Sequence, residues 1–183
     1  MKPAKQLLER VLILRCQIGD KDALAELIGL YHRPLRYFIG HLSDNAEIVD
    51  DLFQDTWVSV IGKISTLRNL ETFPAWLYRI ARNTVYQHFR RKKPFLELDD
   101  NTAVPDETQE SAFSPADAAQ IHECLKKLHP EHKEVLVLRF LEQMSYQQIA
   151  NVVECNLNTV KSRIYYAKLA LKRKMEESHG KAK

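Results

Sequence analysis

Glycine and long hydrophobic runs are both scarce in this sequence. Only 5 of its 183 residues are glycine, and the chain lacks the Asn-Gly and Asp-Gly pairs that are typical of β-hairpins. No run of about 18 apolar residues occurs, so we expect no membrane insertion. The apolar stretch near the N-terminus contains Glu9, Arg10 and Arg15 and precedes no small-residue cleavage site, which favours a helix over a signal peptide.

Residues that carry most enzyme chemistry are few or scattered. The three cysteines, Cys16, Cys124 and Cys155, are odd in number and lack metal-ligand spacing, which argues against a disulfide framework and favours a reducing, cytoplasmic location. The 7 histidines are dispersed, and neither a glycine-rich phosphate loop nor a nucleophile–base pair is visible. We therefore predict that the protein is not an enzyme, has no catalytic residues and needs no metal or cofactor.

Helical periodicity is what the sequence has instead, and it extends along nearly the whole chain. Gly19 and Asp20 are expected to end the first helix and to cap the second. Pro34 is expected to kink or divide that second helix. Asp44 and Glu47 resemble a capping box for a third helix. The sequence therefore predicts an all-α fold.

The composition divides the chain into two small helical domains. Thr72 is expected to cap a fourth helix, which Pro94 ends. The residues that follow are acidic, rich in Pro, Ser and Thr, and without apolar periodicity, as is typical of a flexible linker. We predict an N-terminal domain over 1–93, a linker over 94–114, a C-terminal domain over 115–176 and a tail over 177–183.

The stretch "SYQQIANVVECNLNTVKSRIYYAKLALKRK", residues 145–174, has the pattern of a helix-turn-helix. Ser145 and Gln148 form a capping box for one helix, and Asn156 can cap the next. The apolar stripe of that last helix is expected to face the core: Val160, Ile164, Ala167 and Leu171. Glu154 stands at the turn between the helices, where a positive φ would be costly for a non-glycine residue. Either the turn avoids that conformation or the domain accepts strain.

Basic residues are concentrated in two separate segments. Thr72 to Phe95 and Cys155 to Met175 contain no Asp or Glu, but both contain several Lys and Arg. Two basic segments in separate domains indicate two contacts with one polyanion. Each segment alone is also compatible with a solvated helix face.

Three motifs in order resemble one known family. "LVLRFLEQMSYQQIANVVECNLNTVKSRIYYAKLALK" is similar to the C-terminal DNA-binding domain of bacterial sigma factors of the extracytoplasmic-function (ECF) group, in the sigma-70 family. "DDLFQDTWVSV" resembles the polymerase-binding helix of that family, and "FPAWLYRIARNTVYQHFRRKK" resembles its promoter-melting helix. The resemblance covers roughly residues 15–176. It implies an alternative sigma factor that joins core RNA polymerase, directs it to specific promoters and helps to open the minus-ten element.

The resemblance assigns polymerase binding to the third helix. Its expected contact residues are Asp51, Leu52, Gln54 and Asp55. Spacings of three and four place Asp51, Gln54 and Asp55 on one face, and carboxylates and an amide suit an Arg-rich partner. A solvated acidic face is the alternative.

The resemblance assigns the minus-ten element to the fourth helix and the loop before it. These polar residues suit an extruded base and the phosphates beside it: Ser65, Thr66, Arg68, Asn69, Arg79, Arg82, Asn83, Gln87 and Arg90. Trp76 and Tyr78 are aromatic residues able to stack on a base, although Trp76 is expected in the core.

The resemblance assigns the minus-thirty-five element to the last helix. The candidate DNA-binding residues are Thr159, Lys161, Ser162, Arg163, Tyr165 and Lys168. Lys161 and Arg163 can each donate to guanine O6 and N7, and the sequence does not decide between them.

Two other classes of protein remain as alternatives. A repressor or response-regulator-like protein would explain residues 145–174 but not "DDLFQDTW". A redox-controlled regulator would need a reactive thiol at Cys124 or Cys155. The resemblance itself implies three partners, which are core RNA polymerase, promoter DNA and an anti-sigma factor.

Overall fold

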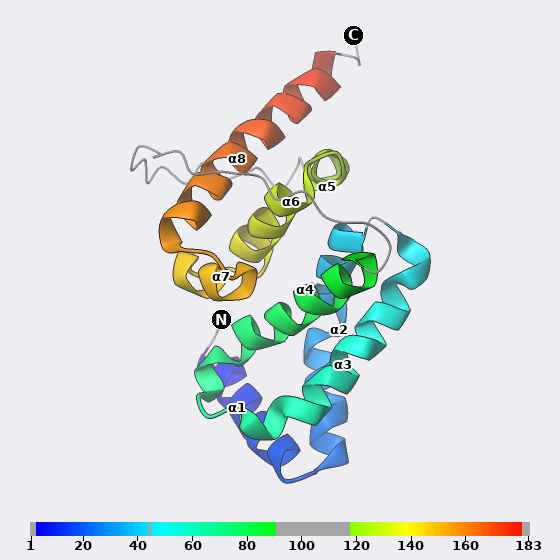
Figure 1. Cartoon of the computed structure of the whole chain (residues 1–183), viewed down its shortest axis with the longest axis vertical. Coiled ribbons are helices and arrows are strands. Elements are labelled where there is room, and N and C mark those ends of the chain that lie inside the picture. Colours follow the sequence, from blue (N-terminus) through cyan, green and yellow to red (C-terminus); the bar gives the residue numbers. More distant parts are fainter. Residues whose placement is uncertain (1–2, 44, 91–117, 181–183) are drawn as a thin grey trace. The chain divides into compact units, whose positions relative to one another are not determined.

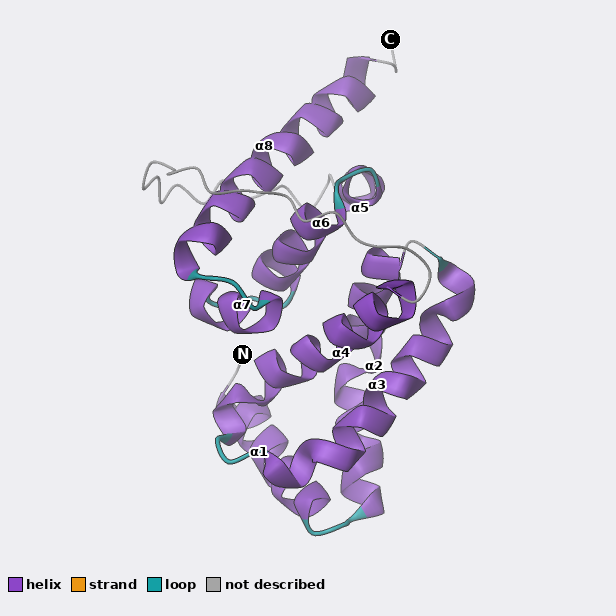
Figure 2. Ribbon diagram, in the orientation of Figure 1, coloured by secondary structure: helices purple, strands orange, loops and turns teal. Residues whose placement is uncertain are grey.

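The computed structural model describes residues 3–43, 45–90 and 118–180. Every regular element in those residues is helical (Figure 2), which confirms the predicted all-α fold. The helices form two compact units, one containing the first four long helices and the other containing the last four (Figure 1). The predicted linker lies outside the described residues. No described helix has the length and apolar character needed to cross a membrane.

The first unit is a helical domain in which each long helix packs on at least one other. Its elements are α1 (Pro3–Gln17), α2 (Lys21–Ser43), η1 (Ala46–Ile48), α3 (Val49–Lys63), η2 (Ile64–Thr66), η3 (Leu70–Thr72) and α4 (Phe73–Arg90). Helix α2 contacts α1, α3 and α4, and α3 also packs against α4. The centre of this core contains Leu35, Phe38 and Tyr78, each fully buried. An edge-on contact at a ring-centroid distance of 5.0 Å joins Phe38 to Tyr78.

The junction between α1 and α2 forms as the sequence predicts. Gly19 adopts a positive φ of 87°, which glycine tolerates without a steric penalty. The Oδ1 atom of Asp20 accepts hydrogen bonds from the backbone N–H groups of Asp22 and Ala23, so it caps α2. Helix α2 then runs without a break through Pro34. Of the two effects expected of Pro34, a kink or a division of the helix, division is therefore wrong.

Of the two other predicted helix caps, one lies outside the described residues and one differs from that in the structure. Asp44 lies outside the described residues, and Asn45 caps the short helix η1 by accepting from the N–H of Glu47 at 2.9 Å. Asn69 similarly caps η3, which precedes α4. The hydroxyl of Thr72 donates to the Asn69 carbonyl at 2.7 Å. At α4 the cap lies upstream of Thr72 because a turn of 3₁₀-helix leads into the α-helix.

The second unit contains the predicted helix-turn-helix. Its elements are α5 (Ala118–Lys126), α6 (Pro130–Leu136), η5 (Val137–Leu141), α7 (Tyr146–Val153) and α8 (Leu157–Gly180). Helix α8 packs on α5 and α6. The segment η5 continues α6 as one π-helical turn. The stripe predicted for α8 is buried, with at most 3% exposure at any member: Val160, Ile164, Ala167 and Leu171.

The caps around the turn of the helix-turn-helix are confirmed. Ser145 and Gln148 form a complete capping box, and the Oδ1 atom of Asn156 accepts from the N–H of Thr159 at 2.8 Å. Glu154 adopts the left-handed conformation, with φ 57° and ψ 40°. Of the two possibilities left by the sequence, the structure shows a strained turn.

Candidate polymerase and nucleic-acid interfaces

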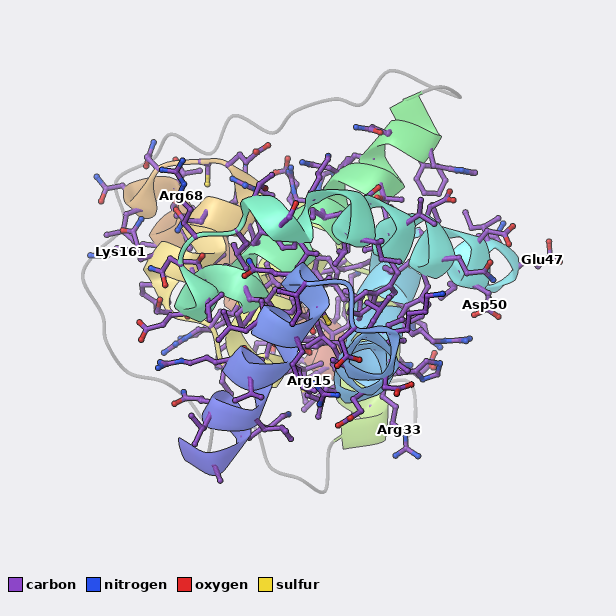
Figure 3. All side chains as sticks on the ribbon, turned by 90° about the horizontal axis from the view of Figure 1, so that it is seen from below. Arg15, Arg33, Glu47, Asp50, Arg68 and Lys161 are labelled. Carbon is purple, nitrogen blue, oxygen red and sulfur yellow. The ribbon has the colours of Figure 1, made fainter. Side chains whose placement is uncertain are left out.

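Helix α3 presents a polar face with an apolar extension. Asp51, Gln54 and Asp55 are exposed and lie on one side of the helix. Val58 and Ile61 continue the same side and are 69% and 49% exposed. The start of this helix projects from the domain, where Glu47 and Asp50 point outward (Figure 3). Together these residues make a mixed acidic and apolar surface.

Leu52 does not belong to this surface. Its side chain is 1% exposed and packs in the core with Phe53, Trp57 and Val60. It lies on the buried face because steps of four residues align it with Thr56 and Val60, which are both fully buried. The surface of α3 therefore consists of the residues that flank Leu52.

The loop between α3 and α4 exposes its polar side chains. Ser65, Thr66, Arg68 and Asn69 are all exposed. Two of these side chains also hold the backbone. The Thr66 hydroxyl donates to the Lys63 carbonyl at 2.7 Å, and the Asn69 side-chain oxygen accepts from the N–H of Glu71 at 3.0 Å. The loop is therefore a sequence of short capped turns.

Helix α4 has a basic face that contains aromatic rings. Helical spacing places Arg79, Arg82, Asn83 and Tyr86 on one side, and all four are partly exposed. The Arg82 guanidinium carbon lies 4.5 Å from the centroid of the Tyr86 ring, a distance typical of a cation–π contact. Gln87 is exposed at the edge of this face. The side chain of Arg90 lies outside the described residues.

The two candidate stacking residues of α4 exchange their expected places. Tyr78 is fully buried, whereas Trp76, expected in the core, is partly exposed. Trp76 lies three residues before Arg79 and so shares the basic face. Its ring also contacts Phe73 at a centroid distance of 5.9 Å. The three-residue spacing from Trp76 to Arg79 indicated this position in the sequence, but the large apolar indole ring favoured the prediction of a buried residue.

Helix α8 separates its candidate residues into an outer and an inner group. Lys161 is exposed and projects outward (Figure 3), and Tyr165 and Lys168 are partly exposed on the same side. Thr159 is also partly exposed, in the first turn of the helix. These four residues occupy the N-terminal half of α8, which is the part that a helix-turn-helix inserts into a major groove.

Arg163 and Ser162 make contacts within their own domain. A guanidinium nitrogen of Arg163 lies 3.4 Å from the Glu131 carboxylate in α6, and the two side chains are 11% and 6% exposed. The Ser162 hydroxyl donates to the carbonyls of Asn158 and Thr159 at 3.2 and 3.0 Å, and the residue is buried. Of the two basic residues that the sequence left as base readers, the geometry favours Lys161.

The described residues offer few groups suited to metal binding or to redox chemistry. The part of the chain that the structure describes holds no cluster of three or more His, Cys, Asp or Glu suited to a metal ion. Cys16, Cys124 and Cys155 form no disulfide bond, and Cys124 is buried. Burial also raises the pKa of the Cys16 thiol above its ordinary value, which makes the reactive thiolate less available.

Comparison with known proteins decides the family. Models of sigma-70 region 2 and sigma-70 region 4 match residues 27–95 and 118–171. RNA polymerase sigma factor SigV of Bacillus subtilis (strain 168) is 31% identical over 118 residues, which cover 64% of this chain and 69% of SigV. The ECF RNA polymerase sigma-E factor of Haemophilus influenzae is 28% identical over 186 residues, which cover 94% of this chain and 98% of that protein. The chain belongs to the ECF sigma factors of the sigma-70 family.

The fold of this sigma factor is also found in a solved complex. The sigma factor RpoE of Bartonella quintana, bound to the anti-sigma factor NepR, matches with a TM-score of 0.62 and 24% identity. The match covers 83% of this chain and 96% of RpoE. The region 2 match begins within α2 and includes α3 and α4, and the region 4 match begins at α5 and ends within α8. As a sigma factor the protein is a transcription initiation factor and not an enzyme, as the sequence predicted.

Proposed function

We propose that this sigma factor divides its contacts with polymerase and promoter among three surfaces. The exposed face of α3 binds core RNA polymerase, the loop of residues 64–72 with the basic face of α4 binds the minus-ten element, and the outer side of α8 binds the minus-thirty-five element. The observation that supports this division is the placement of two basic faces on two separate domains. Separate domains suit two promoter elements separated along the DNA.

The polymerase surface combines charge with apolar area. Asp51 and Asp55 can accept charge-assisted hydrogen bonds from arginine or lysine. Val58 and Ile61 add apolar surface that loses contact with water on binding. Such a combination is typical of an interface whose centre is apolar and whose rim is charged.

The minus-ten surface suits a strand whose bases have left the stack. Arg79 and Arg82 provide positive charge for the backbone, and Trp76 and Tyr86 provide rings beside that charge. Asn83 offers both a donor and an acceptor to a base edge. The exposed side chains of the loop, such as Ser65 and Arg68, can surround an extruded base.

The minus-thirty-five surface suits duplex DNA. Lys161 can donate to guanine O6 or N7 in the major groove, and the ring of Tyr165 offers an apolar contact to a thymine methyl group. Lys168 lies two turns along the helix from Lys161 and suits a phosphate, which adds affinity without sequence preference.

An anti-sigma factor is the proposed regulatory partner. The support is the complex of a related fold, RpoE, with NepR. We propose that the chain acts in the cytoplasm, where core RNA polymerase is found, and that the anti-sigma factor competes with polymerase for it.

Reconstituted transcription tests the proposal. The purified chain is mixed with bacterial core RNA polymerase and a pool of genomic DNA fragments, and transcript starts are mapped. We expect defined starts that share two spaced sequence elements and that vanish without the chain. Tight binding of the chain alone to duplex DNA, without polymerase binding, would contradict the proposal.

A matched pair of variants tests the assignment on α8. Lys161→Ala should reduce discrimination at one base pair of the upstream element by about tenfold, since one base contact contributes about 1–3 kcal/mol. Lys172→Ala removes the same charge from an exposed position of the same helix. It should weaken binding to all sequences alike, as expected for phosphate attraction. Equal effects of the two variants on discrimination would remove Lys161 from the base-reading surface.

A further inference from the structure

Gln17 joins the end of α1 to the loop between α3 and α4. Its side-chain nitrogen Nε2 donates to the Ile64 carbonyl at 2.9 Å and to the Leu67 carbonyl at 2.8 Å. The two acceptors are 47 and 50 residues away in sequence. A carboxamide NH₂ group has two donors on one nitrogen, so a single side chain can bind both carbonyls. Nothing in the family motifs quoted above includes this residue.

A second contact from α1 holds the other end of the same loop. Arg10 lies two turns before Gln17 on α1, on the same face, and its guanidinium pairs with Glu71 in η3 at 2.6 Å. This pair is exposed, with side-chain exposures of 44% and 67%, so it is a weak contact in water. Helix α1 therefore contacts both η2 and η3. Figure 1 shows the segment of residues 64–72, which contains η2 and η3, beside α1.

The two hydrogen bonds of Gln17 act on the backbone at the two ends of the first turn of the loop. Ile64 is buried and anchors the start of the loop, and the Leu67 N–H donates to the Ile64 carbonyl at 3.1 Å. Beyond Leu67 come Arg68 and Asn69, which are both exposed. The Leu67 carbonyl, held by Gln17, therefore directly precedes the exposed residues Arg68 and Asn69.

We infer that Gln17 is a positioning residue for the minus-ten element, a role that rests on the function proposed above for the loop. A loop that receives an extruded base binds it more tightly when its backbone is already ordered, because less conformational entropy is lost on binding. Gln17 orders the loop from outside, without touching the DNA. It therefore controls how well Arg68 and its neighbours discriminate the captured base.

The central test replaces the amide donors without changing charge or length. Methionine is unbranched, has no N–H group and has a helix propensity close to that of glutamine. Gln17→Met should therefore remove both hydrogen bonds and leave α1 intact. Gln6→Met is the matched control, because Gln6 is exposed on the same helix. Each variant is assembled with core RNA polymerase on a promoter mapped as above.

Two readouts separate positioning from general stability. Hydrogen exchange of the amides of residues 65–69 should become about tenfold faster in Gln17→Met and should not change in Gln6→Met. Holoenzyme with Gln17→Met should lose about tenfold in discrimination between the preferred base and its substitutes at the captured position. Polymerase binding and the unfolding midpoint should remain close to those of the original chain.

Arg68→Ala distinguishes failure of this inference from failure of the proposed function. If Arg68→Ala lowers discrimination and Gln17→Met does not, the loop reads the promoter and the positioning role of Gln17 is wrong. Faster exchange in Gln17→Met without a change in discrimination would also overturn that role. If neither variant alters discrimination, the loop does not read the captured base and both proposals fail.

Discussion

Both domains bury a glutamate side chain between helices, but each gives the carboxylate a different partner. In the first domain Glu9 of α1 is 4% exposed, and its Oε2 atom accepts a hydrogen bond from the Tyr31 hydroxyl of α2 at 2.7 Å. In the second domain Glu131 of α6 is also 4% exposed, and it pairs with the Arg163 guanidinium of α8 at 3.4 Å. One carboxylate therefore has a neutral donor and the other has a cation.

The difference in partner decides how each site responds to change. Burial raises the pKa of Glu9 above its ordinary value of 4.5, while the Tyr31 hydrogen bond and the charges of Lys5 and Arg10 oppose that rise. The first site can therefore shed its charge by taking up a proton. Removing the guanidinium from the second site would leave a carboxylate buried without its cation. The comparison predicts that the second domain is more sensitive to loss of its partner.

The largest effect is expected from Arg163→Ala. Loss of one member of a buried ion pair destabilises a protein by about 3–5 kcal/mol. Because Arg163 is partly exposed, we expect the free energy of unfolding to fall by about 3 kcal/mol. The measurement is urea unfolding followed by far-ultraviolet circular dichroism, with hydrogen exchange in α6 and α8. The urea midpoint measured by tryptophan fluorescence should not change, because both tryptophans, Trp57 and Trp76, lie in the first domain.

The matched control removes both charges. Glu131→Leu combined with Arg163→Met should restore stability to within about 1 kcal/mol of the original chain, since apolar replacement of a buried pair is often neutral or stabilising. Arg163→Ala with unchanged stability but altered promoter base preference would show that Arg163 reads DNA and that the ion pair is incidental.

The ion pair between Glu131 and Arg163 shows which features of the α8 surface the sequence could not predict. Helical periodicity predicted the buried stripe of α8, and the capping rules predicted Ser145, Gln148 and Asn156. The side chain of Arg163 has the same chemistry whether it meets a guanine or a glutamate. Only the packing of α6 on α8 brings Glu131 within reach, and that contact spans 32 residues of sequence.

Contacts between distant segments account for the other differences as well. The long-range hydrogen bonds of Gln17 leave no trace in local sequence patterns. Leu52 is different, because steps of four residues align it with Thr56 and Val60, which are buried on the same helix. Its assignment to the polymerase surface came from a motif that mixes buried and exposed positions. Position within a motif therefore predicts less about a residue than its helical face does.

A smaller effect is expected from Tyr31→Phe in the first domain. The change removes the hydroxyl donor to Glu9 but keeps the ring, which packs edge-on against Phe73 at 5.6 Å. Leaving a buried acceptor without its donor costs about 1–3 kcal/mol. Because Glu9 can take up a proton, we expect the free energy of unfolding to fall by about 1 kcal/mol. Tryptophan fluorescence during urea unfolding measures it in this domain.

The pH dependence of Glu9→Gln is the control for this site. Since the pKa of Glu9 is raised in the folded state, its favourable contribution is fully present below pH 4.5 and is lost as pH rises through the folded-state pKa. Glu9→Gln has no such titration, so its stability relative to the original chain should increase as pH rises from about 4 to 7. If the difference in free energy of unfolding between Glu9→Gln and the original chain stays constant over that range, burial does not raise the pKa of Glu9.

The smallest effect is expected at one of two left-handed turns, where the two domains again differ. The first domain places Gly19 at φ 87°, and the second places Glu154 at φ 57°. A non-glycine residue in this conformation costs roughly 1–2 kcal/mol, whereas glycine costs about 0.5–1 kcal/mol through the entropy of the unfolded chain. Glu154→Gly should therefore stabilise the second domain by about 0.5 kcal/mol.

Gly19→Ala is the reciprocal change and should destabilise the first domain by about 1 kcal/mol. No heavy atom lies within 4 Å of a Cβ atom built at Gly19, so any loss comes from the backbone conformation alone. Urea midpoints measured by fluorescence for Gly19→Ala and by circular dichroism for Glu154→Gly give the two values. Loss of stability in Glu154→Gly would mean that the Glu154 side chain stabilises the turn by more than its backbone strain costs.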